Sequence, residues 1–263
     1  MREVHAAGQV PRAGSASGLR SRRLAGLRDA LALLAMAVCL ALLVRTFVVE
    51  PFRIPSESML PTLVVGDHLF VDKLSYGARV PFSARRLPAW RDPARGEVVV
   101  FYVGRIGAEV APVDRRPGLA RERFVKRIVG VPGDRVELRG GALFVNGAAA
   151  RRGTARPGAG AAVRAGERLG ERDYATLRQP AQAAPQEDGV WRVEPGRYFV
   201  MGDNREESHD SRRFGTIPRD DIEGPAILLY WSLAGPQPSS GAGRGLALLP
   251  ERIRWDRIGA RVR

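Results

Sequence analysis

The longest hydrophobic stretch of the chain lies near its N-terminus and predicts a helix that spans a membrane. Residues 30–44 carry almost no polar side chain. As a helix they would rise only about 22 Å, short of a hydrocarbon core of about 30 Å. Arg45 interrupts the stretch and residues 46–49 continue it. Because Arg45 lies near one end and can extend its charged head to the interface, we expect a transmembrane anchor at 30–49.

The charges before this stretch predict its orientation. Arginines concentrate in residues 1–29, and basic flanks stay in the cytoplasm, so everything after Glu50 is expected outside. A cleavable signal peptide also has a basic flank, but the bulky residues 45–50 show no obvious cleavage site. A buried globular helix would usually carry a polar face. The pattern therefore favours an anchor, preceded by a basic cytoplasmic tail, over both alternatives.

Beyond residue 50 the hydrophobic pattern changes to short runs that are typical of strands. Residues 97–103 are continuously apolar, as expected of a strand buried on both faces. Gly140 and Gly141 separate two runs and predict a hairpin. No long amphipathic helix is apparent, and the predicted strands are 97–103, 135–138, 142–145, 191–193, 198–201 and 226–231. The exported part is therefore predicted to be mainly β.

Composition sets the limits of this β domain. Residues 148–189 are rich in Ala, Gly, Arg, Pro and Gln, which predicts a variable insertion or mobile loop. Residues 232–263 combine a Pro/Gly/Ser linker with a flexible basic tail. The folded domain is therefore expected at 50–147 and 190–231.

Charge and cysteine content exclude several classes of protein. The formal net charge of +14 admits nucleic acid or anionic lipid as a partner. No stripe of basic residues interleaved with aromatics is present, so lipid is favoured and nucleic acid is not. Cys39 is the single cysteine and lies inside the apolar stretch, so no intrachain disulfide is possible. His5, His68 and His209 are scattered, and we expect neither a metal site nor a cofactor.

Ser58 is the first candidate for chemistry. Pro55 and Pro61 stiffen its segment, and Ser56 lies two positions away, on the same face of an extended chain. A nucleophilic serine needs a base and donors for the oxyanion that it creates. The Ser58 amide and the Ser56 hydroxyl can be those donors. A turn in which the serines cap backbone groups is the alternative.

Lys126 is the candidate base. It lies in an alternating strand, residues 123–131, and shares a face with Phe124 and Ile128. A lysine buried against apolar walls loses solvation of its charged form, so its pKa falls and it can act as a general base. An exposed strand lysine, with its stem over the sheet, is the alternative.

A polar block at 201–212 is the third candidate segment. By itself such a block is typical of a surface loop. Ser208 could hydrogen-bond the lysine amine and orient it, which a buried base requires. The charges of the block could satisfy one another, and they are Asp203 and Asp210 against Arg205 and Arg212.

His209 raises the question of a Ser-His-Asp triad. Its neighbours Ser208 and Asp210 cannot converge on it, because consecutive side chains point apart. A triad of Ser58, His209 and a distant aspartate stays open as an alternative to the Ser58–Lys126 pair.

Together these segments resemble bacterial type I signal peptidase, peptidase family S26. The blocks occur in the family's order after the apolar stretch, at residues 55–63, 95–101, 126–134 and 202–212. With the anchor, the resemblance covers residues 30–231. The chain departs from the family pattern at Glu57, which adds a charge beside Ser58, and at Glu206 and Glu207, where Asp and Asn are more usual. These departures bear on fine specificity rather than on the reaction.

The resemblance implies a β-rich signal-peptidase catalytic fold, preceded by a single transmembrane helix, with a Ser-Lys dyad. By motif position Ser58 is the nucleophile and Lys126 the general base. Ser56 would complete the oxyanion hole with the Ser58 amide, and Ser208 would orient Lys126. The remaining implied roles are a structural ion pair near the site, Asp210 with Arg212, and shallow substrate pockets lined by Ile54, Leu63, Phe124 and Val125.

The resemblance implies a membrane-bound serine endopeptidase that removes N-terminal signal peptides from exported preproteins after a small-x-small site. Its expected partners are these preproteins and the lipid bilayer. Its expected location is the inner (plasma) membrane, with the catalytic domain on the outer, periplasmic side. A self-cleaving regulator would need a DNA-binding domain, which residues 1–29 are too short to hold. A membrane-anchored binding or scaffold protein without catalysis stays open as the alternative.

Overall fold

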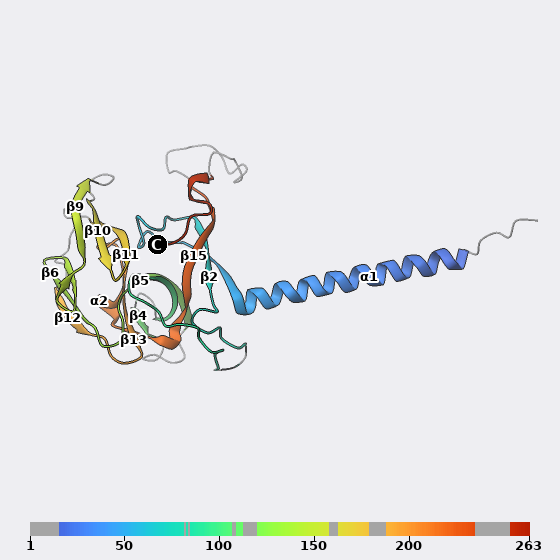
Figure 1. Ribbon diagram of the computed structural model, residues 1–263, viewed down its shortest axis with the longest axis horizontal. Helices are drawn as coiled ribbons and strands as arrows, with labels where there is room; N and C mark the ends of the chain where they lie inside the picture. Colours follow the sequence, from blue (N-terminus) through green and yellow to red (C-terminus); the bar gives the residue numbers. More distant parts are fainter. Residues whose placement is uncertain are drawn as a thin grey trace, which may run out of the picture. The chain divides into compact units, whose positions relative to one another are not determined.

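The computed structural model describes residues 16–81, 83, 85–106, 109–112, 120–157, 163–178, 188–234 and 253–263. It divides into two compact units, Met1–Arg45 and Thr46–Arg263. The elements of both are shown in Figure 1.

The first unit consists of α1 (Ala16–Leu43), which a π-helical turn, Val44–Val48, follows. Gly26–Val48 is the one helix among the described residues that is long and apolar enough to cross a membrane. Its large apolar side chains, such as Leu31 and Leu34, are exposed. Such a surface is stable in hydrocarbon rather than in water. The helix predicted at 30–49 is therefore present, although it begins earlier than predicted.

The second unit is built on a large antiparallel sheet. Its strand order among the described residues is β1-β2-β15-β3-β5-β13-β14, and β4 pairs with β3. The strands are β1 (Val49–Arg53), β2 (Asp67–Asp72), β3 (Val98–Ile106), β4 (Glu109–Pro112), β5 (Ala120–Gly130), β13 (Arg197–Met201), β14 (Ile217–Pro218) and β15 (Ile222–Ser232).

Two smaller sheets lie at the other end of this unit from β2 and β15 (Figure 1). One has the order β12-β6-β7-β8, and the predicted Gly140-Gly141 hairpin joins β6 to β7. The other has the order β11-β10-β9. Their bounds are β6 (Arg135–Arg139), β7 (Ala142–Val145), β8 (Ala148–Ala149), β9 (Arg151–Pro157), β10 (Val163–Leu169), β11 (Arg172–Arg178) and β12 (Gly189–Arg192); a short helix, α2 (Ser211–Phe214), follows β13. The mainly β fold is confirmed.

The central strand β3 is buried on both faces, as its continuous apolar sequence predicts. Val98 and Val100 belong to a core cluster on one face of the large sheet. Val99, Phe101 and Val103 belong to a second cluster on the other face. Because successive side chains of a strand point to opposite faces, one apolar run serves both clusters.

Residues 148–189 differ from the irregular loop that their composition suggested. They contain β9 to β11, paired antiparallel. The prediction missed these strands because arginine and glycine hide the alternation: β10 buries every second residue, Ala165, Glu167 and Leu169. One of these inward residues is charged, so the hydrophobic pattern is broken.

The prediction of a flexible C-terminal tail is wrong for residues 253–263. The Arg257 guanidinium binds the buried carboxylate of Asp67, with Nη2 and Oδ2 2.5 Å apart. The Leu229 N–H donates to the Ala260 carbonyl at 2.9 Å, and Ala260 packs against a core cluster. An arginine-rich sequence suggests a solvated tail, but here one arginine neutralises a buried acid. The prediction for residues 235–252 lies outside the described residues.

Candidate active site

Ser58 lies in the loop between β1 and β2, and its apolar neighbours hold this loop in place. Ile54, Met59 and Leu63 are fully buried in the core cluster beneath the loop. Backbone bonds close the turn: the Leu63 N–H donates to the Met59 carbonyl at 2.9 Å. With these side chains turned inward, Ser58 faces a pocket, although it is only 7% exposed.

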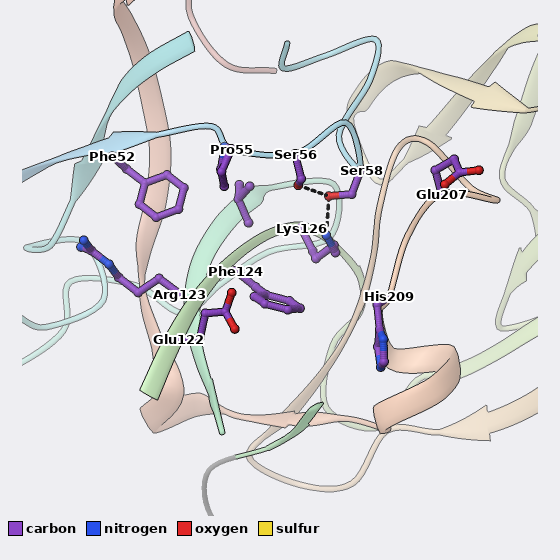
Figure 2. A pocket seen from close by; sticks show the side chains of 11 residues that line it. Phe52, Pro55, Ser56, Ser58, Glu122, Arg123, Phe124, Lys126, Glu207 and His209 are labelled. Atoms are coloured by element: carbon purple, nitrogen blue, oxygen red, sulfur yellow. Dashed lines mark hydrogen bonds between the residues drawn. The ribbon is translucent and has the colours of Figure 1, made fainter. Parts of the chain in front are cut away.

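Lys126 meets Ser58 from β5. Its Nζ lies 2.5 Å from Ser58 Oγ, and Figure 2 shows the two side chains pointing at each other. The lysine is 4% exposed, and its Nζ lies 5.4 Å from the centre of the Phe124 ring. Burial lowers the pKa of Lys126 to about 8, although the charges of Asp210 and Asp203 oppose this shift. The amine is therefore neutral in an appreciable fraction of molecules near neutral pH.

Ser56 is the second hydroxyl at this corner. Its Oγ lies 3.4 Å from Ser58 Oγ, and its side chain lines the same pocket. The Ser58 N–H makes no hydrogen bond with a described residue. The Ser56 hydroxyl and the Ser58 N–H are thus both available as donors.

The charges of the 201–212 block are paired differently from the prediction. Asp210 does bind Arg212, whose Nε and Nη2 each lie 2.8 Å from a carboxylate oxygen. Burial alone would raise the pKa of Asp210, but Arg212 holds it below its ordinary value. Asp203, however, binds Arg127 of β5, and Arg205 binds Glu167 of β10. Pairing within the block is therefore wrong for two of its four charges.

Ser208 comes close to the site, but no hydrogen bond joins it to Lys126. Its hydroxyl is buried and helps Arg212 to hold the pKa of Asp210 below its ordinary value. A Cβ on Gly202 would lie 2.3 Å from Ser208 Oγ and 2.5 Å from the Ser58 carbonyl oxygen. Glycine at 202 is thus what lets the two serine segments approach. The orienting role of Ser208 stays a prediction.

A pocket of about 240 Å³ opens beside the Ser58–Lys126 contact. Phe124 and Val125 line it as expected, whereas Ile54 and Leu63 do not, because they are buried in the core. In Figure 2, Phe52 and Phe124 lie on one side of the contact, and Glu207 and His209 on the other. Lining residues that the sequence did not indicate as pocket residues are Phe52, Pro55, Glu122, Arg123, Glu207 and His209.

Some of these additional pocket residues could have been indicated by one feature of the sequence, their position next to Ser208. Glu207 and His209 flank Ser208 in the polar block at 201–212, so their sequence position indicates that they lie near the site. Phe52 and Glu122 had no such signal, because their place in the pocket depends on the distance between β1 and β5. Among the described residues, no group of His, Cys, Asp and Glu could hold a metal ion.

Comparisons with known proteins show which proteins this chain resembles. The family model described as "Signal peptidase, peptidase S26" matches residues 27–231. A Signal peptidase I of Pseudomonas fluorescens is 36% identical over 214 residues, which cover 76% of this chain and 71% of that protein. A Signal peptidase I of Leptolyngbya laminosa is 33% identical, covering 81% and 86%. A signal peptidase I structure from Enterococcus faecalis V583 covers 51% of this chain and 97% of its own, with 25% identity and a TM-score of 0.31.

These matches identify the class of protein, which is a serine endopeptidase and so a hydrolase. More particularly, the chain belongs to the signal peptidase family, peptidase S26, whose activity is the removal of signal peptides. The resemblance inferred from the sequence is confirmed.

Proposed function

We propose that the chain cleaves signal peptides from preproteins by a Ser58–Lys126 dyad. The observation that carries the proposal is the 2.5 Å contact between the Lys126 amine and the Ser58 hydroxyl. Among the described residues this is the only hydrogen bond of that amine, and no carboxylate forms an ion pair with it. An amine in such a place can lose its proton near neutral pH and serve as a general base.

The geometry supports an acyl-enzyme mechanism. Neutral Lys126 takes the proton of Ser58 as Ser58 Oγ attacks the scissile carbonyl. The Ser58 N–H and the Ser56 hydroxyl stabilise the oxyanion. Protonated Lys126 then gives its proton to the leaving amine, and the C–N bond breaks. Neutral Lys126 finally activates a water molecule, which hydrolyses the ester and releases Ser58.

The substrate is proposed to bind as an added strand. Residues 120–126 of β5 pair with β3 along one edge, while β13 pairs with β5 only from Arg127 to Gly130. The other edge of 120–126 carries no ladder pairing among the described residues and borders the pocket. An extended peptide can bond to such an edge through its main chain. The limited volume beside Phe124 and Val125 suits small side chains before the scissile bond, hence a small-x-small site.

The membrane anchor is proposed to hold this chemistry at the bilayer surface. Ser58 follows Val49 by nine positions, so chain length alone keeps Ser58 within about 30 Å of the end of the apolar segment. Arginines before the helix predict a cytoplasmic N-terminus and a catalytic unit outside the inner membrane. Protease added to spheroplasts should then degrade the unit after Glu50 but not the N-terminal tail.

The test is cleavage of a purified precursor by the full chain in detergent, followed by N-terminal sequencing of the product. Wild-type protein should expose a new N-terminus after a small-x-small sequence. Ser58→Ala and Lys126→Ala should each abolish this product. A chain that binds the precursor but leaves it intact would instead act as a binding or scaffold protein.

A further inference from the structure

The sheet of β9, β10 and β11 is hydrogen-bonded to the loop that follows β13. Leu177, near the end of β11, forms a parallel bridge with Asn204 of this loop. The Leu177 N–H donates to the Asp203 carbonyl at 2.8 Å, and the Arg205 N–H donates to the Leu177 carbonyl at 3.0 Å. Residues 203–205 therefore lie alongside β11 and form an isolated β-bridge with it.

Asn204, the middle residue of the three, contacts the Ser58 segment. The Asn204 N–H donates to the Ser58 carbonyl at 3.1 Å. The Asn204 side-chain amide donates to the Glu57 carbonyl at 3.2 Å. Residues 203–205 thus lie between β11 and the proposed nucleophile. A displacement of β11 would reach Ser58 through backbone hydrogen bonds.

A buried ion pair fixes the orientation of this loop on the sheet. Arg205 and Glu167 are 1% and 3% exposed. The guanidinium donates to both carboxylate oxygens, with Nη1 and Oε1 2.7 Å apart. The Tyr174 hydroxyl donates to Glu167 Oε2 at 2.8 Å. Two hydrogen bonds of this kind fix the orientation of the Arg205 guanidinium relative to the Glu167 carboxylate, as well as the distance between them.

Tyr174 also contacts the strand of the proposed base. The face of its ring lies 4.0 Å from Cζ of Arg127, which follows Lys126 directly in β5. The Arg127 guanidinium also binds Asp203, through hydrogen bonds of 2.8 and 2.6 Å. The small sheet is therefore connected to both members of the proposed dyad by separate contacts.

We propose that the β9–β11 sheet positions the Ser58–Lys126 pair, with Glu167 and Tyr174 as its positioning residues. The inference rests on the proposed dyad. The competing explanation is that these contacts stabilise the fold and nothing more. The two explanations differ in catalysis, because a misplacement of about 1 Å costs on the order of 10²-fold in rate.

The first test removes both buried charges of the ion pair together. The double variant Glu167→Leu/Arg205→Met replaces both charges by apolar side chains of similar size, which folded proteins often tolerate. We expect kcat for a precursor peptide to fall about 10–100-fold, with KM within about twofold of wild type. The protein used is the full chain in detergent, and its folding is checked by circular dichroism.

The matched control lies on the same two strands. Arg168 and Asp173 neighbour Glu167 and Tyr174 in sequence, but point to the opposite face of the sheet. They form an exposed ion pair, with Nε and Oδ1 3.2 Å apart. Asp173→Asn should therefore leave kcat unchanged.

A second pair of variants separates the two roles of Tyr174. Tyr174→Phe keeps a ring face over Arg127 and loses the hydrogen bond to Glu167. Tyr174→Leu loses both. We expect kcat of Tyr174→Leu to be about tenfold below that of Tyr174→Phe, because only the leucine removes the ring face against which Arg127, the neighbour of Lys126, packs.

The outcomes decide between the two explanations. Wild-type kcat in a folded double variant overturns the positioning role. If the double variant does not fold, the Tyr174 pair decides: equal kcat in the two variants overturns the role, and a lower kcat in Tyr174→Leu supports it. Full activity in Ser58→Ala or Lys126→Ala would reject the dyad itself. Inactive dyad variants together with fully active sheet variants would reject only the positioning role.

Discussion

The two sides of β5 hold neighbouring buried cations in opposite environments. Arg127 is fully buried, and its guanidinium binds the Asp203 carboxylate through hydrogen bonds of 2.8 and 2.6 Å. Lys126 is almost as buried, but among the described residues its amine hydrogen-bonds only the Ser58 hydroxyl. Burial lowers the pKa of Lys126 to about 8.

Both side chains are buried, so burial alone does not distinguish them. The group that each cation contacts decides whether it stabilises the fold, as Arg127 does, or can act as a base, as proposed for Lys126. A carboxylate in two-point contact offsets much of the cost of removing Arg127 from water. A hydroxyl brings no opposite charge, so the desolvation of Lys126 is left to favour its neutral form. The same strand therefore supplies a stabilising ion pair and, one residue away, a candidate base.

The largest expected effect comes from removing the amine on the Lys126 side. Lys126→Met keeps a side chain of similar length but cannot accept a proton, so kcat should fall by at least about 10³-fold. The melting temperature should stay the same or rise, because a buried cation without a carboxylate partner has been removed. Cleavage of a precursor peptide and thermal unfolding measure the two effects. Activity within tenfold of wild type would remove Lys126 from the mechanism.

On the Arg127 side the expected loss is one of stability. Arg127→Met leaves Asp203 buried without its cation, which should cost about 3–5 kcal/mol in the free energy of unfolding. Arg127→Met/Asp203→Leu removes both charges and should recover most of that loss. Chemical denaturation of the full chain in detergent compares the three proteins. Equal stabilities of the single and double variants would mean that Asp203 is compensated by other groups.

The pH dependence should report Lys126 and not Arg127. Only the neutral amine can take the Ser58 proton, so kcat/KM should rise about tenfold per pH unit below the Lys126 pKa and level off above it. The midpoint should lie near the pKa of about 8 that burial produces. A midpoint between 6 and 7, lost in His209→Ala, would instead assign the base to His209.

The smallest effect is expected at His209 itself. This residue lines the pocket and stacks on Phe214 with ring centres 5.8 Å apart, whereas the Ser58 hydroxyl is hydrogen-bonded to the Lys126 amine. His209→Ala should therefore leave kcat within about threefold of wild type, far from the 10²–10⁴-fold loss expected of a general base. Steady-state kinetics on the same peptide provide the measurement. A loss above a hundredfold would contradict the two-residue dyad.

The elements that could be predicted are those whose signal is local. The apolar helix, the strand β3 with both faces buried, and the Gly140-Gly141 hairpin each follow from a few adjacent residues. Ser58 and Lys126 lie 68 positions apart, and the resemblance of their surrounding motifs, rather than periodicity, brought them together. β10 could not be predicted, because the inward-facing Glu167 breaks its apolar alternation.

The ion pairs show the limit of sequence reasoning most clearly. Asp203 pairs with a residue 76 positions away and Arg205 with one 38 positions away, whereas their sequence neighbours suggested pairing within the block. Asp210 and Arg212, two positions apart, pair as predicted. Pairing at short range depends on local geometry, but pairing at long range depends on which strands the fold places side by side.

By itself the amino-acid sequence determined the apolar helix, the strand-rich unit after it and the family, because periodicity and motif order are properties of nearby residues. Only the tertiary structure decided that the Lys126 amine lies against a hydroxyl, that Arg127 receives the carboxylate, and that β11 lies beside residues 203–205 and contacts Arg127 of β5. Desolvation and charge pairing depend on distances between residues far apart in the chain, and those distances exist only after the sheets have packed.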